Sequence, residues 1–175
     1  MTGLALRIHL AHGASGSAAS MKPWTGGLAD RGFDAAAVQL PRSSAERAIS
    51  AYRDAAPPSA TTVIGGHSFG GRVASLLAAE EDYAGLVLMS YPLHRPGHPE
   101  SVDGRMAHWA RISCPVLLLS GESDPFARIG LLREAVAKLP DAELVTYPAV
   151  RHGLDAVRED ALDRIAAWLR KLAVR

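Results

Sequence analysis

The chain has 175 residues, with 19 basic and 18 acidic side chains and 48% hydrophobic residues. This length fits one domain with one core, and we expect a single domain over residues 1–175. The formal net charge of +1 creates no field that would attract a nucleic-acid backbone or an anionic membrane surface, so we expect neither as a partner.

The single cysteine, Cys114, cannot form an internal disulfide. The first residues show neither the basic start nor the long apolar stretch of a secretory leader. No apolar run reaches the roughly 20 residues that a membrane helix requires. Together these features predict a cytoplasmic protein.

Along the chain, short apolar segments alternate with longer segments of helical period, a pattern typical of repeated βαβ units. The expected strands are residues 4–10, 35–39, 62–64, 86–89, 116–119 and 144–147. The expected helices are residues 22–31, 43–55, 69–80, 128–139 and 155–172. Most of the strands are apolar throughout, as strands are when helices cover both faces of a sheet.

Two further expectations concern local structure. Asp155 is a good N-cap candidate for the last helix, because a carboxylate accepts hydrogen bonds from the first free N–H groups. Residues 90–112 interrupt the alternation with several prolines and glycines. We expect them to form an excursion over the carboxyl edge of the sheet, with a short helix at residues 102–110.

The most informative segment runs from an apolar strand, through Gly66-His67-Ser68-Phe69-Gly70, directly into a helix. A strand-turn-helix of this kind holds its serine in a strained backbone conformation above the sheet. Glycines stand two residues before and after the serine because a side chain at either place would collide with the closely packed backbone. Ser68 is therefore the candidate nucleophile; a simple helix cap, the alternative, does not need both glycines.

A serine hydroxyl becomes a good nucleophile when a base accepts its proton and an acid orients that base. In the chain order typical of this motif, the acid follows a later strand and the histidine precedes the last helix. Asp124 and His152 occupy those two places. The alternatives are that Asp124 only stabilises the turn at Pro125, that Glu122 is the acid, and that His152 is an ordinary loop residue.

A tetrahedral oxyanion requires two backbone N–H donors. We expect one from Phe69, which follows the nucleophile at the positive N-terminal end of a helix. The other is expected from Ala14, in the loop after the first strand, where Gly13 allows a tight turn; Ser15 is the alternative donor.

Three residues are candidates for substrate contact because we expect them in segments that border the site. They are Tyr91 and His94, in the 90–112 excursion, and Trp24. The alternative is that each packs in the core or bonds locally.

The remaining histidines are not expected to act in the chemistry. His12 and His67 should support their own loops. His94, His98 and His108 lack the spacing of a metal-ligand set, so we expect no metal site, and the chemistry above requires no cofactor.

Four segments of the chain resemble the α/β-hydrolase superfamily, in its small dienelactone-hydrolase-like branch: His12-Gly13, Gly66–Gly71, Gly121–Asp124 and His152-Gly153. The resemblance spans nearly the whole chain and implies the fold and the triad, but no substrate. Residues 91–100 further resemble a group of small hydrolase-like proteins.

The sequence departs from that family in three ways. It begins at what would be the family's third strand, it lacks an insertion long enough for a cap domain, and it carries Ser68 where dienelactone hydrolases proper have cysteine. We expect a minimal α/β-hydrolase fold, with a six-stranded, mainly parallel sheet, helices on both faces and no cap domain. The expected strand order is second, first, third, fourth, fifth, sixth, and the acyl pocket should be shallow or open.

The sequence thus predicts a serine hydrolase that cleaves a carboxylic ester or thioester of a small molecule through an acyl-enzyme intermediate. Three alternatives remain. The fold can serve as a catalytically silent interaction module, since a fold alone does not establish chemistry. The same three residues can also serve a lyase or a perhydrolase. Nucleic-acid binding is the third, and the balanced charge disfavours it.

Overall fold

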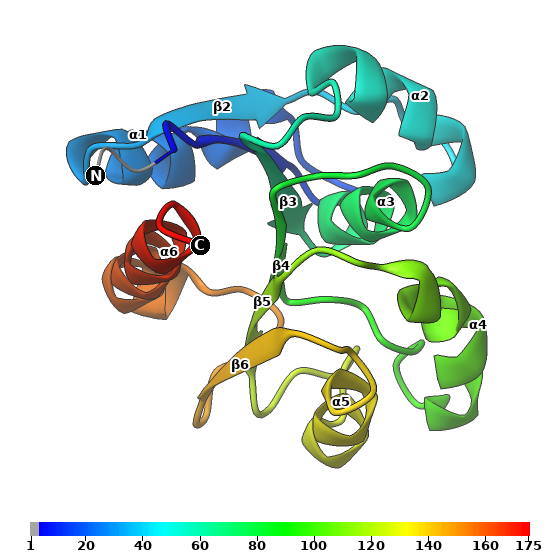
Figure 1. The fold of residues 1–175 in the computed structure, drawn as a ribbon. Helices are drawn as coiled ribbons and strands as arrows, with labels where there is room; N and C mark the ends of the chain where they lie inside the picture. Colours follow the sequence, from blue (N-terminus) through cyan, green and yellow to red (C-terminus); the bar gives the residue numbers. More distant parts are fainter. Residues whose placement is uncertain (1–3) are drawn as a thin grey trace.

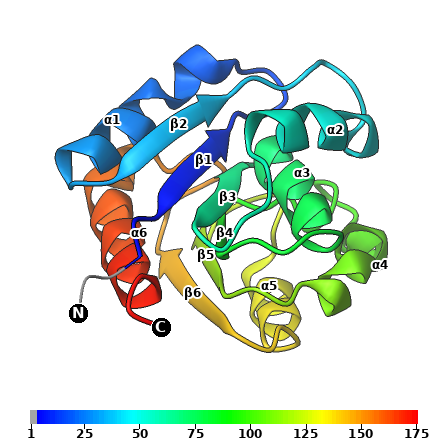
Figure 2. The same cartoon turned by 45° about the horizontal axis from the view of Figure 1, so that its top comes forward.

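The computed structural model describes residues 4–175, and its strands form one six-stranded sheet. The strands are β1 (Arg7–Ala11), β2 (Asp34–Val38), β3 (Thr62–His67), β4 (Gly85–Met89), β5 (Val116–Gly121) and β6 (Ala142–Tyr147). Their order is β2-β1-β3-β4-β5-β6, and every neighbouring pair is parallel, which confirms the expected arrangement. Figure 2 shows β1 and β2 with their arrowheads pointing the same way.

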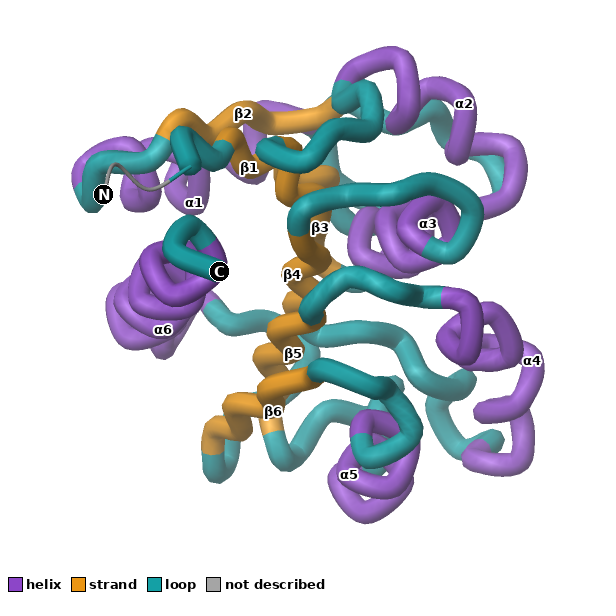
Figure 3. The backbone as a smooth tube through the Cα atoms, viewed as in Figure 1, coloured by secondary structure: helices purple, strands orange, loops and turns teal. Residues whose placement is uncertain are grey.

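The helices lie in two layers, one on each side of the sheet (Figures 1 and 3). One layer holds α1 (Lys22–Asp30) and α6 (Arg158–Leu172). The other holds α2 (Ala45–Ala55), α3 (Phe69–Ala78), α4 (Val102–Met106) and α5 (Ile129–Val136). The longest of them, α6, ends beside Leu4, whose N–H donates to the carbonyl of Ala173 at 2.9 Å.

Each face of the sheet has its own buried cluster, and this explains why residues 116–119 of β5 are all apolar. Leu117 and Leu119 pack toward α1 and α6, whereas Val116 and Leu118 belong to the cluster under α2, α3 and α5. Because successive side chains of a strand point to opposite faces, a strand covered on both sides needs an apolar residue at every position.

The last helix begins later than expected. A short 3₁₀ helix, Asp155–Val157, precedes α6, and the N-cap of α6 is Val157. The expectation that Asp155 caps this helix was therefore wrong. The Asp155 carboxylate instead accepts a hydrogen bond from the guanidinium of Arg158 at 2.9 Å, because the tighter 3₁₀ turn places it outside the first turn of α6.

Residues 90–112 form α4 and the following 3₁₀ helix, Ala107–Arg111, close to the helix expected over residues 102–110. The 3₁₀ helix packs beside α3. Their apolar side chains drive this placement, since Leu93 and Trp109 are buried. Only Pro92 and Arg105 reach the cavity beside Ser68. Within residues 4–175, no helix has both the length and the apolar character to cross a bilayer.

Candidate active site

Ser68 lies on the turn that joins β3 to α3, with φ 50° and ψ −114°. A residue with a side chain rarely adopts such a positive φ, and the strain typically costs about 1–3 kcal/mol. The surrounding glycines make the turn possible: a Cβ on either Gly66 or Gly70 would lie 2.4 Å from the carbonyl oxygen of Ala11. The turn therefore presents the Ser68 hydroxyl where β3 ends and α3 begins.

The three expected catalytic side chains form one row of hydrogen bonds. Nε2 of His152 lies 2.8 Å from Oγ of Ser68. Nδ1 of His152 lies 2.8 Å and 3.0 Å from the two carboxylate oxygens of Asp124. A carboxylate can only accept, so Nδ1 carries the proton and Nε2 is free to accept from the serine hydroxyl. The side chain of Asp124 is fully buried and that of His152 is 24% exposed.

The loop after β5 fixes the carboxylate of Asp124. One carboxylate oxygen accepts the N–H of Phe126 at 2.8 Å. The ring of Phe126 also packs against the imidazole of His152, with 4.3 Å between ring centroids. Phe126 therefore restrains both the acid and the base.

A second contact joins the acid loop to the histidine loop. The N–H of Ser123 donates to the carbonyl of Val150 at 2.9 Å. The backbones approach so closely that a Cβ on Gly121 would lie 2.1 Å from that same carbonyl oxygen. The close approach places Asp124 beside the loop that carries His152.

Glu122, the rival acid, faces another direction. Its carboxylate accepts the hydroxyl hydrogen of Thr146 at 2.8 Å and pairs with Arg133 at 3.4 Å. These contacts turn Glu122 toward β6, whereas Asp124 contacts the imidazole of His152.

His67 supports the backbone of the candidate base. Its Nε2 donates to the carbonyl of His152 at 3.0 Å. Burial lowers the pKa of His67 from its ordinary value, which keeps the ring neutral near pH 7. The sequence analysis expected a supporting role for this residue but did not identify its partner.

The loop after β1 approaches Ser68 from the other side. A Cβ on Gly13 would lie 3.8 Å from Cβ of Ser68 and 3.0 Å from the His67 ring. His12 braces this loop, because Nδ1 donates to the carbonyl of Gly13 at 2.7 Å and Nε2 accepts the N–H of Leu40 at 3.0 Å. Ala14 then lines the same cavity as Ser68 and Phe69.

A cavity of about 350 Å³ opens beside Ser68. Its apolar wall consists of Ala14, Phe69, Pro92 and Phe126. The remaining wall is charged and contains Glu46, Arg72 and Arg105. Neither arginine was identified from the sequence, although Arg72 stands one helical turn after Ser68, which is a spacing that brings side chains to one side of a helix.

The three residues expected to contact substrate lie elsewhere. Tyr91 is 1% exposed, and its hydroxyl donates to the carbonyl of Arg105 at 2.5 Å. His94 is buried; Nδ1 donates to the carbonyl of Arg95, and Nε2 accepts the N–H of Arg128. Trp24 belongs to α1, where it is buried. These side chains are buried, and those of Tyr91 and His94 form hydrogen bonds with neighbouring backbone groups. None of the three lines the cavity beside Ser68.

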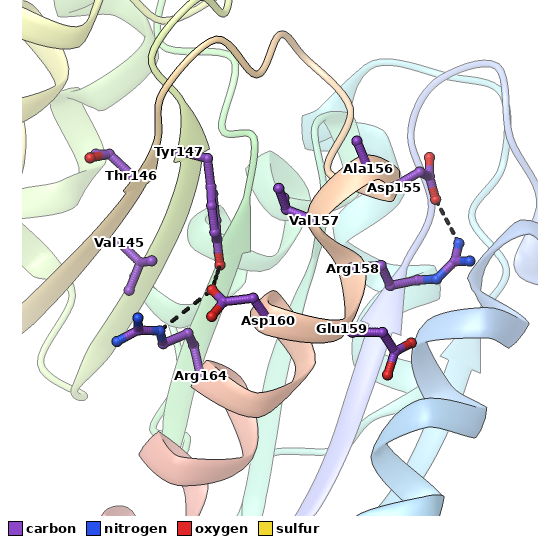
Figure 4. A pocket seen from close by; sticks show the side chains of 10 residues that line it. All are labelled: Val145, Thr146, Tyr147, Asp155, Ala156, Val157, Arg158, Glu159, Asp160 and Arg164. Carbon is purple, nitrogen blue, oxygen red and sulfur yellow. Dashed lines mark hydrogen bonds and ion pairs between the residues drawn. The ribbon is translucent and has the colours of Figure 1, made fainter.

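A larger hollow than the cavity beside Ser68, of about 590 Å³, lies between β6 and the start of α6 (Figure 4). Its polar side chains pair with one another. The Tyr147 hydroxyl donates to Asp160 at 2.9 Å, and Arg158 pairs with Asp155 at 2.9 Å. Because these groups are already paired and the row of Ser68, His152 and Asp124 does not line this hollow, the smaller cavity beside Ser68 is the better candidate site.

Comparison with solved structures shows the same fold in proteins of low sequence identity. A monoacylglycerol lipase of Paleococcus ferrophilus is 17% identical with a TM-score of 0.80, over 97% of this chain and 97% of that one. The protein Est1E of Butyrivibrio proteoclasticus, solved with ferulic acid, is 16% identical with a TM-score of 0.79, over 97% and 90%. The esterase Pf2001 of Pyrococcus furiosus is 16% identical with a TM-score of 0.77, over 97% and 84%.

At the level of sequence, no curated protein matches the chain significantly. Residues 38–170 match a family described as an alpha/beta hydrolase domain. This match covers well over half of the chain and includes β3, the turn at Ser68 and the loops that carry Asp124 and His152. The protein is a member of the alpha/beta hydrolase family.

Proposed function

We propose that this protein is a serine hydrolase that cleaves a carboxylic ester or thioester of a small molecule through an acyl-enzyme intermediate. The single observation that carries the proposal is the row of hydrogen bonds from Ser68 through His152 to Asp124. The row stands on a strained turn beside an open cavity, which is the setting that nucleophilic catalysis requires. The presence of esterases and lipases among proteins of the same fold is a further support.

In the first half of the reaction, Oγ of Ser68 attacks the substrate carbonyl while Nε2 of His152 accepts the hydroxyl proton. Asp124 holds the imidazole in the correct tautomer and stabilises the imidazolium that forms. The N–H groups of Phe69 and Ala14 donate to the oxyanion. Phe69 is the first residue of α3, so its N–H has no acceptor within the helix and is free to do so.

The tetrahedral intermediate then collapses. His152 returns its proton to the leaving alcohol or thiol, and the acyl group stays on Ser68. Water, deprotonated by the same imidazole, attacks the acyl-enzyme and releases the acid. Every proton transfer in this cycle uses groups that the chain itself supplies, so the proposal includes no metal or cofactor.

The test combines an activated ester with a fluorophosphonate label, which modifies an activated serine. The wild-type protein should hydrolyse p-nitrophenyl acetate and carry the label on Ser68, and Ser68→Ala should lose both. Ser90→Ala is the matched control: Ser90 also has φ 50°, and its buried hydroxyl has no hydrogen-bond partner within residues 4–175. Activity that survives Ser68→Ala, or a label on another serine, would contradict the proposal.

The same experiment separates the alternatives. A silent interaction module would neither label nor turn over substrate. A lyase would label at Ser68, but it would cleave its substrate without adding water and so form products other than the free acid and alcohol. A perhydrolase would also label at Ser68, and it would form a peracid in place of the free acid when hydrogen peroxide is added. Identification of the products by mass spectrometry therefore decides between these chemistries.

A further inference from the structure

The charged wall of the cavity beside Ser68 is unusual because its positive charges exceed its negative charges. Arg72 and Arg105 both line the cavity, and Glu46 is the only acidic side chain among the residues of the wall. Glu46 pairs with Arg72, with 3.0 Å between its carboxylate oxygen and Nη2 of the arginine. After this pairing, one positive charge remains without a partner.

The unpaired charge belongs to Arg105. Among residues 4–175, its guanidinium donates only to the neutral carbonyl of Pro92, at 3.3 Å. None of the ion pairs formed within residues 4–175 includes Arg105. Burial, followed by the charge of Arg72, lowers the pKa of Arg105 below its ordinary value. Arg105 is partly buried, and a partly desolvated guanidinium without a counterion is stabilised when an anion binds beside it.

Arg72 offers a second donor in the same wall. Its Nε is buried and has no hydrogen-bond partner among the described residues, although its Nη2 contacts Glu46. Arg72 stands on α3 one turn after Ser68, so this donor is fixed relative to the nucleophile. Each guanidinium is a planar, positively charged group that suits a carboxylate, and both line the same cavity.

We propose that the substrate is an ester or thioester that also carries a free carboxylate, which binds to Arg105 and Arg72 while Ser68 attacks the ester carbonyl. This inference rests on the proposed function. The wall has one excess positive charge, which one carboxylate balances, and the cavity of about 350 Å³ suits a short chain between the two ends. A neutral ester of the same length would leave Arg105 without a counterion.

The kinetic test uses two substrate pairs that differ in this charge. Monoethyl glutarate against ethyl pentanoate places the carboxylate on the acid side. Acetoxyacetate against its methyl ester places it on the alcohol side. In at least one pair, kcat/KM should be about 10–100-fold higher for the charged member, as a charge-assisted hydrogen bond provides. The preference should weaken as salt is raised.

The arginine variants then identify the source of the preference. Arg105→Gln should reduce the ratio of the two kcat/KM values about tenfold or more, and Arg72→Gln should reduce it as well. Arg111→Gln is the matched control, because Arg111 is exposed in the same segment and does not line the cavity; it should leave the ratio unchanged. Equal ratios in the wild type and all three variants would overturn the inference, but they would not contradict the proposed serine hydrolase activity.

A binding measurement separates failure of the inference from failure of the chemistry. Calorimetric titration of Ser68→Ala with glutarate should show binding that Arg105→Gln, added to the same protein, weakens at least tenfold. If binding depends on Arg105 but the wild type hydrolyses no ester, the carboxylate site stands and the proposed function fails. If Ser68→Ala with and without Arg105→Gln bind glutarate equally, the inference fails.

Discussion

The ring of His67 donates from Nε2 to the main-chain carbonyl of His152 at 3.0 Å. Two adjacent positions of the turn between β3 and α3 therefore have different tasks: Ser68 bonds to the imidazole of His152, and His67 holds the backbone from which that imidazole projects. The two rings are tilted, with 5.4 Å between their centroids, and the hydrogen bond of His67 goes to the main chain of His152. The link is the main chain of the histidine loop.

Removing this donor should affect the rate of reaction more than substrate binding. His67→Phe keeps a ring but leaves the carbonyl of His152 without its donor, so the imidazole should shift relative to Ser68. A shift of about 1 Å can lower a rate a hundredfold, and we expect a fall in kcat of about 10–100-fold with KM changed by less than threefold. His67→Gln, which can still donate, should recover most of the activity.

A purely structural role for His67 has a different signature. It would lower the melting temperature of both variants while kcat stays at the wild-type value in the protein that remains folded. Steady-state kinetics and thermal unfolding of His67→Phe and His67→Gln, measured in parallel, distinguish the two outcomes.

The second prediction concerns the acid. Asp124→Asn replaces a carboxylate that only accepts with an amide that can also donate, so Nδ1 of His152 no longer has to carry the proton. The wrong tautomer cannot accept the proton of Ser68, and kcat for ester hydrolysis should fall about 10³–10⁴-fold. Glu122→Gln is the control, because Glu122 contacts Thr146 and Arg133. A larger loss in Glu122→Gln than in Asp124→Asn would reverse the assignment of the acid.

The third prediction is a pH dependence of stability. His108 is buried behind α3, where Nε2 lies 2.8 Å from Oγ of Ser75. Burial, with the charges of Arg72 and Arg111, lowers the pKa of His108 from 6.5 to about 4. The unfolded chain therefore binds a proton near pH 6.5, and the folded protein does so only near pH 4.

The contribution of neutral His108 to the free energy of unfolding is fully present above about pH 6.5 and is lost as the pH falls toward 4. Allowing for solvent screening, the loss should be roughly 1–3 kcal/mol of unfolding free energy. Urea denaturation at pH 7 and pH 4.5 measures it, and His108→Gln should show a smaller difference between the two pH values than the wild type. An identical difference in both proteins would show that His108 does not titrate on unfolding in this range.

The sequence predicted the sheet well because the central strands are buried on both faces and carry continuous apolar runs, such as residues 116–119 of β5. The parallel order then followed from the alternation of strands and helices. The candidate triad was predictable for a related reason: Ser68, Asp124 and His152 each follow a strand, and the carboxyl ends of parallel strands meet at one edge of a sheet. Short-range patterns were sufficient for both.

Features that depend on packing between distant segments were not predictable. The path of residues 90–112 depends on how Leu93 and Trp109 are buried, so the position of Arg105 beside Ser68 has no signature in the local sequence. The same limit explains why Tyr91 and His94 were expected to contact substrate. A loop position suggests access to the site, but only the fold determines whether a side chain faces a cavity or the core.

The fourth prediction concerns Gly26 and Gly27, two adjacent glycines of α1. Both lower the helix propensity of this segment. The structure distinguishes them. A Cβ on Gly26 would meet nothing within 4 Å, whereas a Cβ on Gly27 would lie 2.4 Å from Cδ1 of Leu162 on α6. Leu162 is itself 1% exposed, so its side chain has little room to move away.

Gly26→Ala should therefore raise the free energy of unfolding by about 0.5–1 kcal/mol, because alanine has the higher helix propensity. Gly27→Ala has the same propensity gain but must force α1 and α6 apart, and overpacking typically costs about 1–3 kcal/mol. Urea denaturation of both variants should place Gly27→Ala below the wild type and Gly26→Ala above it. Equal stabilisation by both would mean that α1 and α6 do not pack as closely in solution as the Gly27–Leu162 contact requires.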